Sequence, residues 1–137
     1  MLVRDVLKYD DIMRDLIDNS QLNAKIKFRF LNMRKQFEPI VQNFQSVREE
    51  ILKKHSETKE DGTMGIFAPE RDKFESEEAY NEAVTSFEKT VAEFNKDIEP
   101  ILNDEAKIEI TKFKADEMMD AGISSDALLV LYDLIEE

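Results

Sequence analysis

The sequence predicts a mainly α-helical protein with a minor β part, built around a long antiparallel helical hairpin. Two long stretches repeat apolar residues every 3.5 positions on average, which is typical of helices that pack lengthwise on one another. The chain has only three glycines, which argues against an α/β fold rich in tight turns. Its 137 residues correspond to a single domain, residues 1–137, by the usual relation between length and domain number.

A short amphipathic helix is expected at the start of the chain, within residues 1–20. Apolar residues recur there at helical spacing, and we expect the helix to end around Asn19 or Ser20. The residues predicted to face inward are Val6, Ile12, Met13, Leu16 and Ile17.

The two long helices are predicted over residues 21–55 and 76–103. The first carries the stripe Ile26, Phe30, Met33, Phe37, Ile40, Phe44, Val47 and Ile51. The second carries the matching stripe Tyr80, Val84, Phe87, Val91, Phe94, Ile98 and Ile101. Because a loop of about 20 residues joins them, the stripes predict the two faces of an antiparallel pair. Ser76 is expected to cap the start of the second helix.

Two of the three prolines lie inside these predicted helices. Pro39 falls on the outward side of the first stripe, whose spacing continues through it without a phase slip. A helical proline removes one backbone hydrogen bond, so we favour one kinked helix, with two separate helices as the alternative. Pro100 is expected in the last turns of the second helix.

Short β elements and a closing helix are predicted around these helices. Within residues 56–75, Asp61-Gly62 is a turn signal that favours a hairpin. Residues 106–114 alternate as a strand does, and we expect them to pair with residues 63–67.

The last predicted helix spans residues 124–136, after a helical turn that Gly122 stops, with Ser124 as its cap. Its predicted inward-facing residues are Leu128, Leu131, Tyr132 and Ile135.

The net charge of −12 is distributed unevenly along the chain. Residues 1–54 carry 11 Lys/Arg against 8 Asp/Glu, whereas residues 55–137 carry 8 against 23. The simplest interpretation is that the basic stretch between residues 19 and 37 pairs with the acidic second half of the chain, within the same fold or oligomer. Nucleic acid is disfavoured as a partner, because the overall charge repels a polyanion and no binding motif is present. No apolar run has the length of a membrane helix, so we expect no membrane association and a location inside a cell.

Catalytic chemistry has little support in the sequence, so we expect a non-enzymatic protein without a cofactor. The chain has no cysteine, which excludes disulfides and thiolate nucleophiles. His55 is the single histidine, and a general base would need an orienting carboxylate and a pocket that the sequence does not reveal. Helical carboxylate pairs such as Glu78 with Glu82 lack the histidine ligands of a di-iron bundle, so no metal site is expected.

Oligomerisation is motivated by apolar residues outside the main stripe of the first long helix. A two-helix hairpin cannot cover both faces of such a helix, so these residues and their basic neighbours are candidates for an interface. The candidates are Phe28, Leu31, Arg29, Arg34, Lys35 and Val41.

The order of these elements resembles a family of small uncharacterised proteins encoded by tailed phages and prophages. It is carried by "LNAKIKFRFLNMRKQFEPIVQNFQSVREEILKKH", the "DGT" turn, "AYNEAVTSFEKTVAEFNKDIEPILN", "AKIEITKF" and "GISSDALLVLYDLIEE". The resemblance covers most of the chain but rests on pattern. It implies a viral origin, an accessory role and a location in the host cytoplasm, with virion association as a second possibility. It transfers no site residues.

Three functions therefore remain open. The first is a phage-type accessory protein with a structural or assembly role, which acts through surfaces shared with other subunits, virion proteins or host proteins. The alternative is an acidic inhibitor of a host defence or nucleic-acid-binding protein, whose charge blocks a basic groove. A third is an enzyme or ligand-sequestering protein whose pocket forms at a subunit interface.

Overall fold

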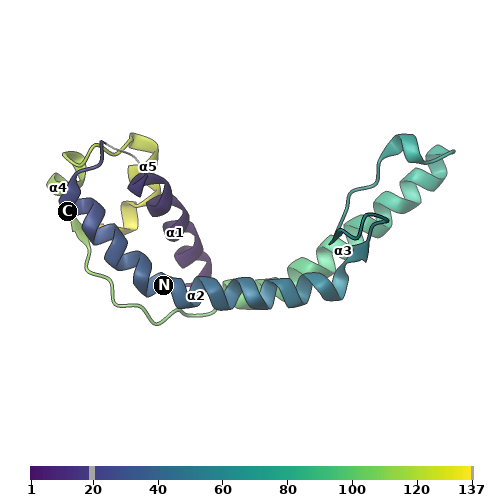
Figure 1. Ribbon diagram of the computed structural model, residues 1–137, viewed down its shortest axis with the longest axis horizontal. Helices are drawn as coiled ribbons and strands as arrows, with labels where there is room; N and C mark the ends of the chain where they lie inside the picture. Colours follow the sequence, from purple (N-terminus) through teal and green to yellow (C-terminus); the bar gives the residue numbers. More distant parts are fainter. Residues whose placement is uncertain (19–20, 137) are drawn as a thin grey trace. The chain divides into compact units, whose positions relative to one another are not determined.

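The protein is mainly α-helical with a minor β part, as the computed structural model shows for residues 1–18 and 21–136 (Figure 1). The contacts divide the chain into two compact units, which we call the terminal unit (Met1–Asn43 with Asn103–Glu137) and the hairpin unit (Phe44–Leu102). The elements are α1 (Val3–Ile17), α2 (Ala24–His55), β1 (Glu57–Thr58), β2 (Met64–Gly65), the 3-10 turn η1 (Arg71–Lys73), α3 (Glu77–Leu102), β3 (Phe113–Lys114), α4 (Ala115–Met119), α5 (Ser125–Val130), the 3-10 turn η2 (Tyr132–Leu134) and β4 (Ile135–Glu136). Helix α2 contributes to both units, and the predicted single-domain organisation stays a prediction.

The terminal unit holds most of the buried side chains. Helix α1 lies beside the segment that follows α3, because the Val3 amide donates to the Asp104 carbonyl at 2.9 Å and the Ala106 amide donates to the Met1 carbonyl at 2.8 Å. The helix ends at Ile17 and the residues predicted for its end lie outside the described residues. The buried apolar side chains of this unit are Val3, Val6, Tyr9, Met13, Leu16, Leu22, Ile26, Phe30, Met33, Phe37, Ala106, Phe113, Met118, Ala121, Ala127, Leu131 and Leu134.

The first half of the long apolar stripe belongs to this core. Phe30 is fully buried and meets Phe113 edge-on, with 5.3 Å between the ring centroids. The prediction that the whole stripe packs on the second long helix is therefore wrong for its first half. The reason is that the C-terminal part of the chain returns to this end of α2 and supplies Phe113 as a bulky apolar partner.

The β elements pair differently from the prediction. Strand β1 pairs antiparallel with β2, as expected for the hairpin at Asp61-Gly62. The predicted strand over residues 106–114 is reduced to β3, which pairs in parallel with β4, with Phe113 opposite Ile135. Its predicted partner, residues 63–67, lies in the hairpin unit and pairs with β1 instead. Alternation indicates an extended segment with one covered face, but it does not identify the partner.

The C-terminal helix is shorter than predicted. The predicted cap is confirmed, because the Ala127 amide donates to Ser124 Oγ at 3.3 Å, but α5 ends at Val130. The chain then turns through η2 into β4, so the residues after Val130 no longer follow the α-helical spacing on which the prediction of inward-facing side chains was based. Leu131 and Leu134 are consequently buried, whereas the side chain of Tyr132, which was predicted to face inward, is 62% exposed.

Both long helices continue through their prolines. Helix α2 runs unbroken through Pro39, so the alternative of two separate helices is wrong, and Pro39 is exposed as expected. The kink at Pro39 stays a prediction. Pro100 lies in the last turns of α3 and is also exposed. The predicted cap of α3 is present, because the Ala79 amide donates to Ser76 Oγ at 3.1 Å. Helices α2 and α3 run antiparallel in the hairpin unit (Figure 1). No helix in the described part of the chain is long and apolar enough to cross a membrane.

Candidate functional site

The hairpin unit lacks a core of its own. Every residue from 44 to 102 is described, and among them only Gly65 and Ile98 are buried. Helix α3 therefore buries a single side chain along its 26 residues. The terminal unit buries its apolar side chains far more completely. This contrast makes the hairpin unit the part of the protein whose apolar surface is least covered.

The exposed apolar surface follows the predicted stripes. We call these stripe residues of the hairpin unit the seam, and apart from Ile98 all of them retain accessible surface. Val47 is 37% exposed, and Met64 on β2 adds a side chain that is 50% exposed. The other partly covered members of the seam are Phe44, Ile51, Tyr80, Val84, Phe87, Val91, Phe94 and Ile101.

The end of α2 is held to α3 by the single histidine. His55 Nε2 lies 2.7 Å from Asp97 Oδ2, and the imidazole meets the Phe94 ring edge-on at 6.5 Å between centroids. The His55 side chain is only 12% exposed, and Lys54 Nζ lies 3.7 Å from the same carboxylate oxygen. The hydrogen bond from His55, followed by the charge of Lys54, lowers the pKa of Asp97 below its ordinary value.

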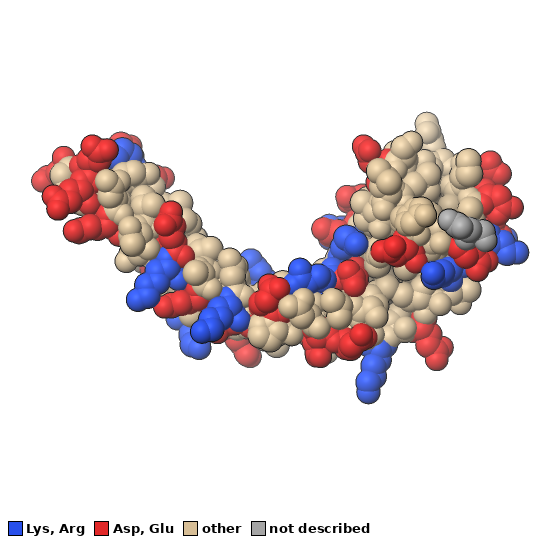
Figure 2. All heavy atoms as spheres, turned by 180° about the vertical axis from the view of Figure 1, so that it is seen from behind, with Lys and Arg blue, Asp and Glu red and all other residues tan. Residues whose placement is uncertain are grey.

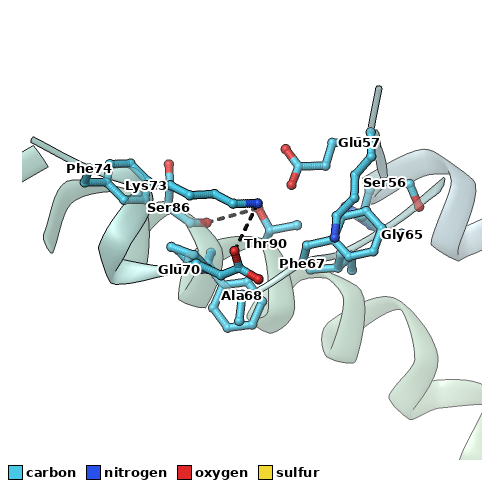
Figure 3. Close-up of a pocket in the computed structure, with 16 residues that line it drawn as sticks. Ser56, Glu57, Gly65, Phe67, Ala68, Glu70, Lys73, Phe74, Ser86 and Thr90 are labelled. Atoms are coloured by element: carbon cyan, nitrogen blue, oxygen red, sulfur yellow. Dashed lines mark hydrogen bonds and ion pairs between the residues drawn. The ribbon is translucent and has the colours of Figure 1, made fainter. Parts of the chain in front are cut away.

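A pocket of about 510 Å³ opens beside this pair, between the β1–β2 hairpin, the following loop and α3 (Figure 3). Figure 3 shows Lys73 reaching across the opening toward Glu70, whose carboxylate lies 3.0 Å from Lys73 Nζ. This pairing lowers the pKa of Glu70 and raises that of Lys73. Phe67 forms an aromatic wall, with Glu57 near the opening. Thr90 Oγ1 is occupied by donating to the Ser86 carbonyl at 3.0 Å.

Sequence reasoning missed this arrangement. His55 lines the pocket and has an orienting carboxylate, the two features that the sequence did not reveal. The signal that could have found Asp97 is its place next to Ile98 on the second stripe, combined with the register of the two helices. Periodicity defines the face of each helix but leaves the register open, so the pairing of His55 with Asp97 could not be derived.

The six predicted interface residues are not equivalent. Phe28 and Leu31 are 64% and 42% exposed, Lys35 is exposed, and Val41 is half-buried. Arg29 instead packs over the Phe113 ring, 4.2 Å from its centroid.

The arginines of this set are engaged within the terminal unit. Arg29 Nη1 lies 3.2 Å from Glu117 Oε2, and Lys25 Nζ lies 3.0 Å from Glu117 Oε1. The hydrogen bond from Lys25 and the charges of both bases lower the pKa of Glu117. Arg34 Nε lies 2.9 Å from Oδ1 of Asp10, which is buried. The predicted pairing with the acidic second half is thus confirmed for Lys25 and Arg29 and wrong for Arg34, whose partner lies in the first half.

Acidic side chains are concentrated in one segment of the hairpin unit. Residues 57–82 carry nine Asp/Glu against three Lys/Arg. Figure 2 shows the acidic side chains crowded around the N-terminal turns of α3. Within the described residues, no three His, Asp or Glu side chains are grouped so as to hold a metal ion.

Comparisons of the chain with models of known protein families, with curated proteins and with solved structures find no match.

Proposed function

We propose that this is a non-enzymatic, phage-type accessory protein that acts through protein–protein surfaces, with a structural or assembly role. Its hairpin unit associates with the hairpin unit of a second copy, and the two pairs of helices form a four-helix arrangement around the seam. The proposed location is the host cytoplasm, with association to the virion during assembly. The viral assignment rests on the resemblance of the element order to tailed-phage proteins.

The observation that carries the proposal is the poor burial of the hairpin unit. A two-helix hairpin covers one side of each helix, and most helical stability in proteins comes from packing of the apolar face. With Ile98 as the one buried apolar side chain in residues 44–102, this packing is incomplete within one chain. A second hairpin with the same seam supplies matching apolar surface, as in bundles built from two hairpins.

Repulsion between the two negatively charged hairpin units opposes this association and determines how it depends on salt. Residues 44–102 carry fifteen Asp/Glu against eight Lys/Arg, so two copies repel one another. Salt screens repulsion between exposed charges and leaves burial of the apolar seam largely unchanged. Self-association should therefore strengthen as salt is added.

Light scattering of the full chain at micromolar concentration tests the proposal. We expect a mass that is a multiple of the 16.0 kDa of one chain. A mass of one chain at every salt concentration would contradict self-association through the seam.

The acidic segment of the hairpin unit favours one alternative, an inhibitor that blocks a basic groove of a host protein. The nine acidic residues within 57–82 motivate it, because a concentrated negative field attracts a basic surface. A pull-down from host lysate at low and high salt separates the two functions. Salt-sensitive recovery of a nuclease or defence protein supports the inhibitor, and recovery of virion proteins supports the assembly role.

A further inference from the structure

The pocket of the hairpin unit holds a cation of its own chain on an aromatic ring. Lys59 Nζ lies 3.9 Å from the centroid of the Phe67 ring, and both residues line the pocket. The turn that places Lys59 is well defined, because its amide donates to the Thr63 carbonyl at 2.9 Å and its carbonyl accepts from the Gly62 amide at 2.9 Å. The ring face of Phe67 is therefore a site at which a positive charge is already accommodated.

The Phe67 ring lies against the backbone of the preceding strand, β2. Gly65 on β2 is buried, and a Cβ added there would lie 3.1 Å from Phe67 Cζ. The absence of a side chain at residue 65 lets the ring lie close to the backbone, which restricts its position. A restricted aromatic ring binds a flat cation with little loss of conformational entropy.

The other charged groups of the pocket leave one carboxylate for an incoming cation. Glu70 is paired with Lys73 at 3.0 Å. Glu57 also lines the pocket, and Figure 3 shows its carboxylate beside the opening, on the same side as Phe67. No ion pair of Glu57 or Lys59 is found within the described residues. An incoming cation thus meets an aromatic ring and a carboxylate together.

We propose that this pocket binds an arginine side chain of a basic peptide segment, whose guanidinium displaces the Lys59 ammonium from the Phe67 ring and pairs with the Glu57 carboxylate. Arginine suits both contacts better than lysine, because its planar guanidinium stacks on aromatic rings and donates two parallel hydrogen bonds to a carboxylate. The bound species is a partner protein or peptide with an accessible arginine.

The negative electrostatic potential around the pocket favours a basic peptide as the ligand. The three basic residues within 57–82 are all engaged inside the unit: Lys59 lies on Phe67, Lys73 pairs with Glu70, and Arg71 Nη1 donates to the Phe74 carbonyl at 3.1 Å. The nine acidic residues of the same segment leave a strong negative potential, which attracts a basic peptide at long range. This attraction weakens with salt, opposite to the salt dependence proposed for self-association.

Fluorescence anisotropy with a labelled tetra-arginine peptide and a tetra-lysine peptide tests the proposal on the full-length chain. We expect tetra-arginine to bind several-fold more tightly than tetra-lysine. The variant Lys59→Gln should tighten tetra-arginine binding several-fold, because it removes the internal competitor. Lys53→Gln is the control, because this substitution makes the same charge change at an exposed residue that lies outside the pocket.

Two further variants test the contacts. Phe67→Leu keeps an apolar side chain but removes the ring face, and Glu57→Gln removes the carboxylate; each should weaken tetra-arginine binding several-fold. Glu60→Gln is the matched control, because Glu60 is exposed and does not line the pocket. Circular dichroism of each variant shows whether the hairpin unit remains helical.

The outcomes separate a built site from general attraction. Equal weakening by Glu57→Gln and Glu60→Gln, or equal affinity for the two peptides, would show attraction to an acidic surface only and overturn the proposal. Absence of measurable binding at low salt would also overturn it. None of these results bears on self-association, because self-association is measured separately, from the mass of the protein in the absence of peptide.

Discussion

His55 Nε2 and Asp97 Oδ2 lie 2.7 Å apart and join the last residue of α2 to α3. The pair closes the hairpin unit at the end of α2. In a unit with so little buried apolar surface, a charge-assisted hydrogen bond is a larger share of the stability than it would be in a well-packed domain.

Replacing Asp97 with Asn should destabilise the protein near neutral pH and have progressively less effect in acid. The folded protein lowers the pKa of Asp97, so its contribution is present above the ordinary pKa of about 4 and is lost as the pH falls through the lower folded-state value. Thermal unfolding of wild type and Asp97→Asn from neutral to acidic pH measures this. Glu93→Gln on the same helix is the control, since Glu93 is exposed. A difference in melting temperature that persists unchanged in strong acid would contradict the assignment.

Replacing Arg34 with Ala should destabilise the terminal unit by about 1–3 kcal/mol, because it leaves the buried carboxylate of Asp10 without its cation. Urea unfolding of the variant measures the loss. Lys35→Ala is the matched control: Lys35 is the exposed neighbour, and its removal should change the free energy of unfolding by less than about 0.5 kcal/mol. Equal effects of the two substitutions would show that the Arg34–Asp10 pair contributes nothing specific.

Replacing Gly122 with Ala should cost more stability than replacing Gly62 with Ala. Both glycines have positive φ, +81° and +88°, so each substitution strains the backbone by about 1–2 kcal/mol. Only at Gly122 would the new Cβ also meet a backbone atom, the Gln21 carbonyl oxygen at 2.8 Å, while nothing lies within 4 Å at Gly62. Parallel chemical denaturation of the two variants gives the comparison. A larger loss for Gly62→Ala would argue against the close packing at residue 122.

Replacing Pro39 with Ala should stabilise the protein, by up to about 3 kcal/mol, since α2 continues through this exposed position and alanine restores a backbone donor. Unfolding monitored by circular dichroism measures the gain, and light scattering shows whether assembly changes. An unchanged mass would make the proline incidental to association, whereas a changed mass would tie it to function. A loss of helix stability would contradict the continuous α2.

Local signals in the sequence predicted much of the fold. The 3.5-residue repeats predicted the two long helices, and Ser76 and Ser124 cap helices as expected. What could not be predicted is which distant segments meet. Phe30 packs on Phe113 rather than on the second helix, and β3 pairs with β4, because these choices depend on where the whole C-terminal segment returns. His55 and Asp97 form a pair for the same reason: two periodic faces do not define the register between them.

Sedimentation velocity of the full chain over a range of micromolar concentrations tests the central claim most directly, that a second copy completes the hairpin unit. The seam variant Val91→Glu is compared with Ala92→Glu, which places the same charge on the exposed neighbouring residue of α3. Circular dichroism selects preparations in which both variants remain helical. We expect wild type and Ala92→Glu to sediment as assemblies whose mass is a multiple of 16.0 kDa, with a larger associated fraction at high salt. Val91→Glu should sediment as a single chain. A wild-type protein that sediments as a single chain at every concentration and salt would contradict the account.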